Sequence, residues 1–199
     1  MKQIEVTVKV KNTLEEIDEL LTSKGFKLIR KSQVEDDYVC PKELKVDKNN
    51  ILEVLSSCVL IRYLKTAEAE FKKLTYKNKE YSKDGVVISE EKINVSIDDT
   101  KKAQELFEKI NFKKLVSVHY DVIVYSNNDY EFAFQDVEGL GLLLEFENEN
   151  DFEGVSDETI VSEKQKMYEI IKTYGIKVEN NYDIKKAYEL VMKKIELAE

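Results

Sequence analysis

The sequence predicts an α+β protein built on a closed eight-stranded antiparallel β-barrel, with helices packed outside the barrel and two more helices near the C-terminus. Eight apolar segments with the alternation of strands lie in residues 1–150, and two amphipathic helical segments interrupt them. Residues 151–199 change to helical periodicity. The strands and helices also form two similar halves. Closing eight mostly antiparallel strands into a barrel would remove exposed strand edges, which favours this architecture.

Length and charge limit the classes of protein that this chain can represent. Its 199 residues suffice for one buried core, so we predict a single domain, 1–199, with the barrel and two helices in 1–150 and the helical segment in 151–199. The formal charge of −9 argues against nucleic acid and anionic membranes as partners. No segment has the pattern of a signal peptide or a membrane span, so we expect a cytoplasmic protein.

Local signals place each element along the chain. Thr13 and Glu16 form a capping box that begins a helix at 13–23, and Gly25 is its stop signal. A second helix begins after Asp99 and ends at Asn111, and residues 42–57 form a long connection with room for one helical turn. The strands are expected at 4–10, 26–40, 58–65, 71–77, 86–97, 112–125, 130–137 and 142–147. The late helices are expected at 161–174 and 184–197.

An internal repeat relates the two halves. A shift of 86 residues aligns the strand, the helix and the phenylalanine after each helix. The aligned residues are Glu5 with Glu91, Leu20 and Leu21 with Leu106 and Phe107, and Phe26 with Phe112. Chance similarity between two amphipathic units is the alternative, but the same offset across all three features favours duplication.

Strand alternation assigns a charged set of side chains to the barrel interior. These residues are Glu5, Thr7, Lys9, Lys73, Thr75, Lys77, Glu91, Glu145 and Glu147. Buried charges must be paired or must bind a ligand, because removing each from water is costly. Clustered carboxylates with cations suit a polyphosphate held together with a divalent metal ion. Internal salt bridges without any ligand are the alternative.

Several segments resemble the CYTH domains, the triphosphate tunnel metalloenzymes. Residues 5–9 are similar to the ExExK signature of this family, and the segments that follow agree with it in type and order. These segments lie at 36–41, 60–62, 74–77, 137–141 and 145–147. The resemblance covers residues 1–150, and the Asp-x-Tyr stretch that ends at Tyr38, together with Tyr188, is most similar to the class IV adenylate cyclase branch. The family fold is an eight-stranded tunnel.

The resemblance implies a site for a small-molecule triphosphate. It implies that Mg²⁺ or Mn²⁺ binds to Glu5, Glu145 and Glu147, that Lys9, Arg62 and Lys77 contact the triphosphate, and that Lys9 and Glu145 are catalytic. Strand alternation adds Glu91, Lys73 and Thr7 as further candidates. We expect hydrolysis of thiamine triphosphate, inorganic triphosphate or a nucleoside triphosphate, because these charges bind phosphate without identifying a nucleoside. Adenylate cyclase activity of the class IV type is an alternative.

The sequence departs from the family pattern at five matching positions. Charged residues of the family are replaced by Thr7, Leu60, Tyr120, Val122 and Gln135. These losses favour a second alternative, a nucleotide- or polyphosphate-binding module with weak catalysis. The late helices have apolar stripes that suit the core or a dimer contact, so we expect a monomer or a homodimer.

The remaining reactive side chains are expected to be structural. His119 is the only histidine and belongs to no catalytic motif. Cys40 and Cys58 have no metal-binding spacing, so we expect reduced cysteines that pack in the core.

Overall fold

A computed structural model describes residues 3–81, 87–148 and 150–197 of the chain, without the side chains of 78–81 and 89–91. The strands are β1 (Ile4–Lys9), β2 (Lys27–Pro41), β3 (Val59–Thr66), β4 (Glu70–Tyr81), β5 (Val87–Ser96), β6 (Phe112–Ser126), β7 (Glu131–Val137) and β8 (Gly141–Asn148). The helices are α1 (Leu14–Ser23), α2 (Ile51–Ser56), α3 (Thr100–Lys109), α4 (Asp157–Thr173) and α5 (Lys186–Glu196). Among the described residues, no helix is both long enough and apolar enough to cross a membrane.

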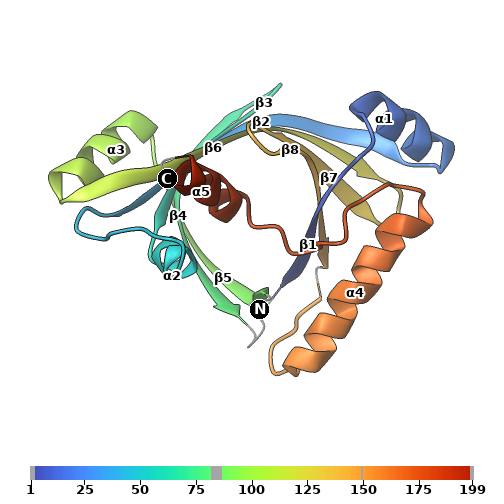
Figure 1. Cartoon of the computed structure of the whole chain (residues 1–199). Helices are drawn as coiled ribbons and strands as arrows, with labels where there is room; N and C mark the ends of the chain where they lie inside the picture. The colour runs from blue at the N-terminus through green and yellow to red at the C-terminus, as the bar shows by residue number, and fades with distance from the viewer. Residues whose placement is uncertain (1–2, 82–86, 149, 198–199) are drawn as a thin grey trace.

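The strands form one antiparallel sheet in the order β1-β8-β7-β6-β2-β3-β4-β5. Figure 1 shows this sheet bending around a central space, with α1 and α4 on one side and α2 and α3 on the other. The prediction of an α+β fold with eight antiparallel strands is therefore confirmed. The order is also symmetric about the β2–β6 pair, since β3 and β7, β4 and β8, and β5 and β1 follow outward in turn. This symmetry agrees with the predicted repeat.

The helix signals in the sequence are confirmed at both helices of the repeat. The capping box of Thr13 and Glu16 is present at α1, and the side chain of Asp99 caps α3. Gly25 and Asn111, the two predicted stop residues, have positive φ angles of 83° and 66°. The predicted late helices differ from α4 and α5 at their starts, because Ser156 caps α4 earlier and α5 begins later, after Lys185. Asp84-Gly85, a residue pair typical of hairpin turns and predicted from the sequence to form one, lies outside the described residues.

The predicted closure of the barrel by strand pairing is not observed among the described residues. β1 and β5 are the two edges of the sheet. The free edge of β1 instead pairs with the segment between α4 and α5: the Thr7 amide donates to the carbonyl oxygen of Tyr182 at 3.1 Å, and the Ile184 amide donates to the carbonyl oxygen of Thr7 at 3.1 Å. This segment satisfies edge groups of β1 that a closed barrel would have paired with β5.

Side chains join the two edges where the backbone does not. The Nζ of Lys164 on α4 lies 2.7 Å from Asp183 Oδ1 and 3.2 Å from the carbonyl oxygen of Val87 on β5. The Val87 amide donates to the other oxygen of Asp183 at 3.3 Å. We call this arrangement the Lys164–Asp183 clasp. The Lys164 side chain is 1% exposed, and its burial lowers its pKa, an effect that Asp183 opposes. The clasp therefore depends on a buried charge with a single acidic hydrogen-bond partner among the described contacts.

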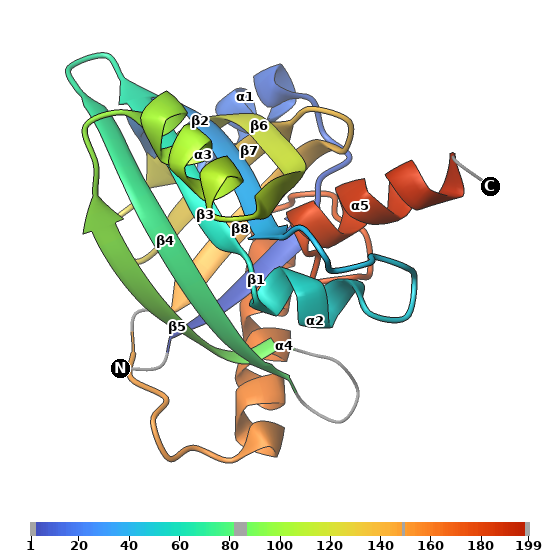
Figure 2. The same ribbon diagram turned by 90° about the vertical axis from the view of Figure 1, so that its left-hand side faces the viewer.

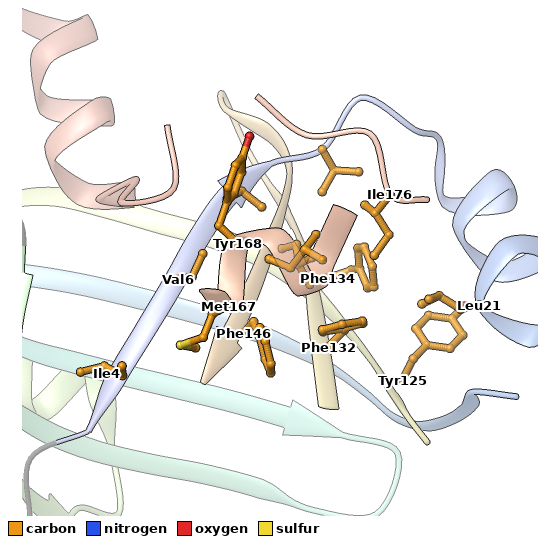
Figure 3. Close-up of a cluster of buried hydrophobic side chains, with 14 of the residues drawn as sticks. Ile4, Val6, Leu21, Tyr125, Phe132, Phe134, Phe146, Met167, Tyr168 and Ile176 are labelled. Carbon is orange, nitrogen blue, oxygen red and sulfur yellow. The ribbon is translucent and has the colours of Figure 1, made fainter. Parts of the chain in front are cut away.

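The largest apolar core lies between α4, α1 and the β1–β8–β7 side of the sheet (Figure 3). Phe132 is fully buried at its centre, where its ring contacts the rings of Phe146 and Phe26 at centroid distances of 5.1 and 5.2 Å. Met167 and Ile171 of α4 are buried in this core, so the apolar stripe predicted there is a core face. A second core contains Ala187 and Val191 of α5. Cys40 and Cys58 are buried and unbridged, as predicted.

Candidate functional site

A cavity of about 170 Å³ lies inside the curve of the sheet. Its charged side chains come from strands β1, β3, β4, β5 and β8 and from the beginning of α5. Residues of α2 also line it, and Figure 2 shows α2 beside α5. A smaller cavity continues beyond it and shares Glu5, Lys92 and Glu147 with it. The space inside the sheet thus extends past these side chains toward the start of β1.

Three carboxylates converge in this cavity. Glu5 on β1 is the register partner of Glu147 on β8, and Thr7 is the partner of Glu145, so strand alternation puts all three acids on one face. One oxygen from each of Glu5, Glu145 and Glu147 lies within 4.8 Å of the others. We call these residues the carboxylate trio. The structure therefore brings together the three residues that the sequence predicts as metal ligands, and Thr7 is buried beside them.

The electrostatics of the carboxylate trio fit a cation. Burial raises the pKa of Glu147, and the negative charges of Glu145 and Glu5 raise it further. Burial also opposes the charge of Glu145, but Lys186 and Lys77 outweigh it and lower the pKa of Glu145 to about 2. A divalent ion with oxygen ligands, such as Mg²⁺ or Mn²⁺, would relieve the repulsion at Glu147. The donor set of the trio suits such an ion.

Replacing Glu147 by glutamine should raise the thermal midpoint of the metal-free protein relative to the wild type, increasingly so as the pH rises. The folded state holds the Glu147 proton more tightly than the unfolded state, because its pKa lies above the ordinary value of 4.5. The contribution of this group to stability therefore falls as the pH rises through that window, and a neutral amide has no such titration. Thermal melts in EDTA from about pH 4.5 to pH 8 measure the difference. A variant that is less stable than the wild type throughout this range would contradict the repulsion.

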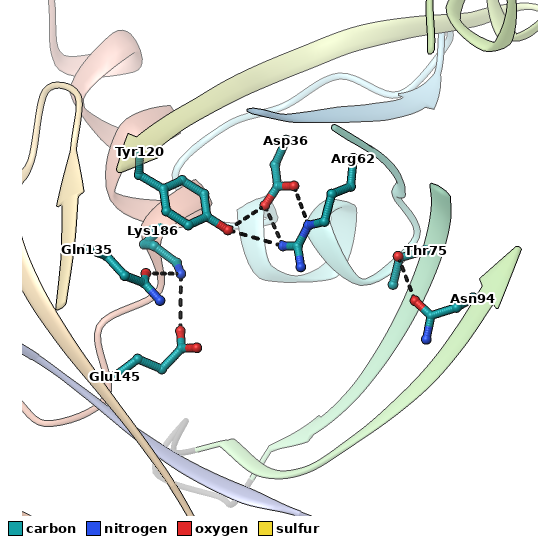
Figure 4. Close-up of polar contacts among 8 residues, drawn as sticks. All are labelled: Asp36, Arg62, Thr75, Asn94, Tyr120, Gln135, Glu145 and Lys186. Atoms are coloured by element: carbon teal, nitrogen blue, oxygen red, sulfur yellow. Dashed lines mark hydrogen bonds and ion pairs between the residues drawn. The ribbon is translucent and has the colours of Figure 1, made fainter. Parts of the chain in front are cut away.

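Arg62 of β3 is held in place by two buried partners (Figure 4). Its Nε and Nη2 each lie 2.6 Å from one oxygen of Asp36, a two-pronged pair in which the Asp36 side chain is 3% exposed. The Tyr120 hydroxyl donates to Asp36 at 3.0 Å and accepts from Arg62 at 3.2 Å. Burial opposes the charge of Arg62, but Asp36 outweighs it and raises the pKa of the guanidinium. Arg62 is therefore charged and fixed against the cavity wall.

Sequence reasoning missed two cationic residues at the beginning of α5. Lys186 donates to Gln135 and, at 3.1 Å, to Glu145, and its Nζ lies 4.7 Å from the centre of the Tyr120 ring. Lys185 also lines the cavity and donates to Asp183 at 2.7 Å. Two adjacent lysines at a helix N-terminus oppose the helix dipole, which is a signal that the sequence contains. Gln135 and Tyr120, two departures from the family pattern, are contacts of Lys186.

The other predicted site residues divide into those that line the cavity and those that do not. Lys77 lines it, together with Lys92 of β5, which the sequence did not single out. Lys9 is absent from the described lining, and its carbonyl oxygen accepts the Glu179 amide at 2.9 Å. Lys73 is the register partner of Arg62 and also lies outside the described lining. The side chain of Glu91 lies outside the described residues.

Two residues with reactive or hydrogen-bonding groups have other surroundings. His119 is half exposed and its Nδ1 lies 3.5 Å from a carboxylate oxygen of Glu138. Thr75 is buried beside the interior and donates to Asn94 at 2.9 Å.

The fold and the cavity together define a class of protein, one whose curved antiparallel sheet encloses a carboxylate trio facing several cations. No family model matches the chain. The chain is 32% identical to the protein named Putative adenylate cyclase MJ0240 of Methanocaldococcus jannaschii, over 190 residues that cover 93% of this chain and 96% of that protein. The chain belongs to the same family as this protein.

Solved structures share the fold. The PH1819 protein of Pyrococcus horikoshii OT3 superimposes with a TM-score of 0.70 at 22% identity, covering 96% of this chain and 99% of that one. A structure described as a putative adenylate cyclase from Vibrio parahaemolyticus has a TM-score of 0.65 at 12% identity, with coverage of 97% and 98%. At these identities the likeness concerns the fold alone.

Proposed function

We propose that the protein is a metal-dependent enzyme that converts ATP to 3′,5′-cyclic AMP and pyrophosphate, in the manner of the class IV adenylate cyclases. The observation that carries this proposal is one cavity in which the carboxylate trio, several cations and an apolar wall meet. The name of the Methanocaldococcus jannaschii relative supports the same reaction. In this reaction the O3′–Pα bond forms, the bond from Pα to the α,β-bridging oxygen breaks, and the 3′-hydroxyl proton is released.

The charged part of the cavity would hold the triphosphate. Glu5, Glu145 and Glu147 would bind Mg²⁺ or Mn²⁺, which supplies charge neutralisation and polarisation at phosphorus when it is bound. Arg62 and Lys77 would contact phosphate oxygens, as the sequence predicts, and Lys92 and Lys186 add cations to the same wall. Positioning and charge stabilisation provide most of the catalysis at phosphorus, so fixed cations such as Arg62 are well suited to it.

The added lysines bear on the weakly catalytic alternative. That alternative rests on charged residues of the family pattern that this chain lacks, and the lost cations are at Leu60, Tyr120 and Val122, with lost acids at Thr7 and Gln135. Lys186 lies beside Tyr120, and Lys92 faces the cavity from β5. A cavity that gains cations from other elements retains the charge that a triphosphate needs, so the loss of cations is no longer a ground for weak catalysis.

The apolar end of the cavity favours a nucleoside over inorganic triphosphate. Leu52 and Leu55 of α2 line this end together with Tyr38, Ile184 and Tyr188. These side chains are only partly buried, so they present apolar and aromatic surface to the cavity. A planar base can pack against such surface, whereas tripolyphosphate has nothing to place there. The sequence alone favoured hydrolysis because it did not show that apolar and aromatic side chains line one end of the cavity.

Product analysis tests the proposal directly. The protein would be incubated with ATP, thiamine triphosphate or tripolyphosphate, each with Mg²⁺ or Mn²⁺, and the products separated by chromatography. Cyclic AMP and pyrophosphate in equal amounts are expected from ATP. Release of inorganic phosphate from any of the three would instead establish a triphosphatase. Binding of ATP without any product would establish the binding module.

Replacing Leu52 by glutamine should weaken ATP binding about fivefold and change tripolyphosphate binding less than about twofold, since partial loss of one apolar contact costs roughly 1 kcal/mol. Leu52 lines the cavity without belonging to a core cluster, so the change should leave the fold intact. Glu53→Gln on the same helix is the matched control, because Glu53 is exposed and absent from the described lining. Calorimetric titration with each ligand measures both affinities. An equal loss of affinity for ATP and for tripolyphosphate would mean that the adenine base does not pack against Leu52.

A further inference from the structure

Glu145 belongs to two charged groups at once. It is a member of the carboxylate trio, with an oxygen within 4.8 Å of oxygens of Glu5 and Glu147. It is also the carboxylate partner of Lys186, whose Nζ lies 3.1 Å from Glu145 Oε2. The Lys186 side chain is 18% exposed and that of Glu145 is 19% exposed, so neither charge is fully screened by water. A cation at the trio and the ammonium of Lys186 would therefore lie close together on the same carboxylate.

Lys186 is held where it is by neighbours other than Glu145. Gln135 accepts a hydrogen bond from its Nζ, which also lies 4.7 Å from the centre of the Tyr120 ring (Figure 4). Both partners are neutral, so Glu145 is the negatively charged partner of the ammonium group among the described contacts. Gln135 and Tyr120 stand where the family pattern has charged residues. The three side chains thus form one arrangement that keeps a cation on Glu145 when no ligand is present.

We propose that Lys186 and the divalent metal compete for Glu145, so that Lys186 is a built-in counter-ion that moves to phosphate when the metal binds. This inference rests on the proposed function, because it assumes that the trio binds metal and that the cavity binds polyphosphate. Metal alone must displace or repel the ammonium, so it binds weakly. A polyphosphate that draws Lys186 away from Glu145 raises the affinity for metal, and by thermodynamic reciprocity metal raises the affinity for polyphosphate. Metal and nucleotide then bind together rather than singly.

The chain offers a matched pair of variants for the test. Lys186→Gln and Lys185→Gln each remove one positive charge from adjacent residues that line the same cavity. Lys185 is bonded to Asp183, whereas Lys186 is bonded to Glu145. The general loss of positive charge is therefore common to both variants, and the direct contact with Glu145 is lost in only one.

Titration with Mn²⁺ alone, followed by the electron paramagnetic resonance signal of the free ion, gives the deciding measurement. Lys186→Gln should bind Mn²⁺ about tenfold more tightly than the wild type, within the usual range of coupling between two sites, and Lys185→Gln less than about threefold more tightly. An equal increase in Mn²⁺ affinity in both variants would show that only the loss of one positive charge matters, and it would overturn the proposal. Unchanged or weaker binding by Lys186→Gln would overturn it as well.

Two further measurements guard against misfolding and separate this inference from the proposed function. Lys186→Met, which retains an unbranched side chain to pack on Tyr120, should tighten Mn²⁺ binding as the glutamine variant does, and both should bind tripolyphosphate more weakly than the wild type in EDTA. If the variants bind Mn²⁺ more tightly and tripolyphosphate more weakly than the wild type, but ATP is not cyclised, the competition stands and the proposed reaction falls. If ATP is cyclised and Lys186→Gln does not tighten Mn²⁺ binding, the reaction stands and the competition falls.

Discussion

Replacing Glu145 by glutamine is expected to lower the rate of ATP turnover by roughly 100- to 1,000-fold, the range found when one charge-stabilising group is removed from an active site. Glutamine has nearly the same shape, but it removes the negative charge that the trio would offer to a metal and that Lys186 contacts. Mn²⁺ should then no longer raise the thermal midpoint of the protein, because a ligand that binds only the folded state stabilises it. Pyrophosphate release and thermal melts with and without Mn²⁺ measure the two effects.

Glu138→Gln is the matched control for this variant. Glu138 also has a carboxylate, but its side chain is 80% exposed and it contacts His119 instead of the trio. This substitution should leave turnover and the Mn²⁺ effect within about twofold of the wild type, as is usual for surface changes. Full activity in Glu145→Gln would remove Glu145 from the proposed site.

Replacing Asp36 by asparagine is expected to destabilise the protein by about 3–5 kcal/mol, because it leaves the largely enclosed guanidinium of Arg62 without its buried counter-ion. For a chain of this size each kcal/mol corresponds to about 2–4 °C, so the thermal midpoint should fall by roughly 6–20 °C. The Tyr120 hydroxyl loses its carboxylate partner as well. Thermal and urea unfolding measure the loss.

The neighbouring Asp37→Asn variant tests whether the burial of Asp36 is the reason for the expected loss of stability. Asp37 points to the opposite face of β2, where its carboxylate accepts from Ser117 and is 25% exposed. Removing its charge should cost less than about 1 kcal/mol, as for other exposed ion pairs. Equal destabilisation by the two substitutions would mean that the Asp36–Arg62 pair contributes no more to stability than the contacts of Asp37 do.

Alternation along strands predicted the eight antiparallel strands and placed the carboxylate trio on the interior face, whereas the closed barrel that it suggested is not observed among the described residues. Glu5, Glu145 and Glu147 occupy every second position on strands that pair with each other, so a shared face follows from local sequence once the pairing is known. The same rule assigned Lys9 to the interior, but the lining given by the structure does not include it. Alternation tells which face a side chain is on, and it does not tell how far along the strand the cavity extends.

The residues that sequence reasoning missed reach the cavity through tertiary contacts: the two lysines at the start of α5 are visible in the sequence, but their place in the fold is not. Lys186 meets Glu145 across 41 positions of sequence. The edge of β1 is covered by a segment that has no strand of its own, so a pattern search for strands could not find it. Barrel closure was expected because eight strands leave two edges, but the C-terminal segment and one buried lysine satisfy groups at those edges instead.

The Lys164–Asp183 clasp also bears on how much of the chain the cavity needs. Every strand precedes Lys164 and Asp183 in the sequence, yet the segment that pairs with the edge of β1 and the side chain that contacts β5 both come from residues after β8. Thr7 pairs with Tyr182 and Ile184, a contact of high sequence separation. Glu5 of the first strand and Lys186 of the last helix line the same cavity. A chain that stopped after β8 would therefore lack the lysines of α5 and the residues that cover both sheet edges.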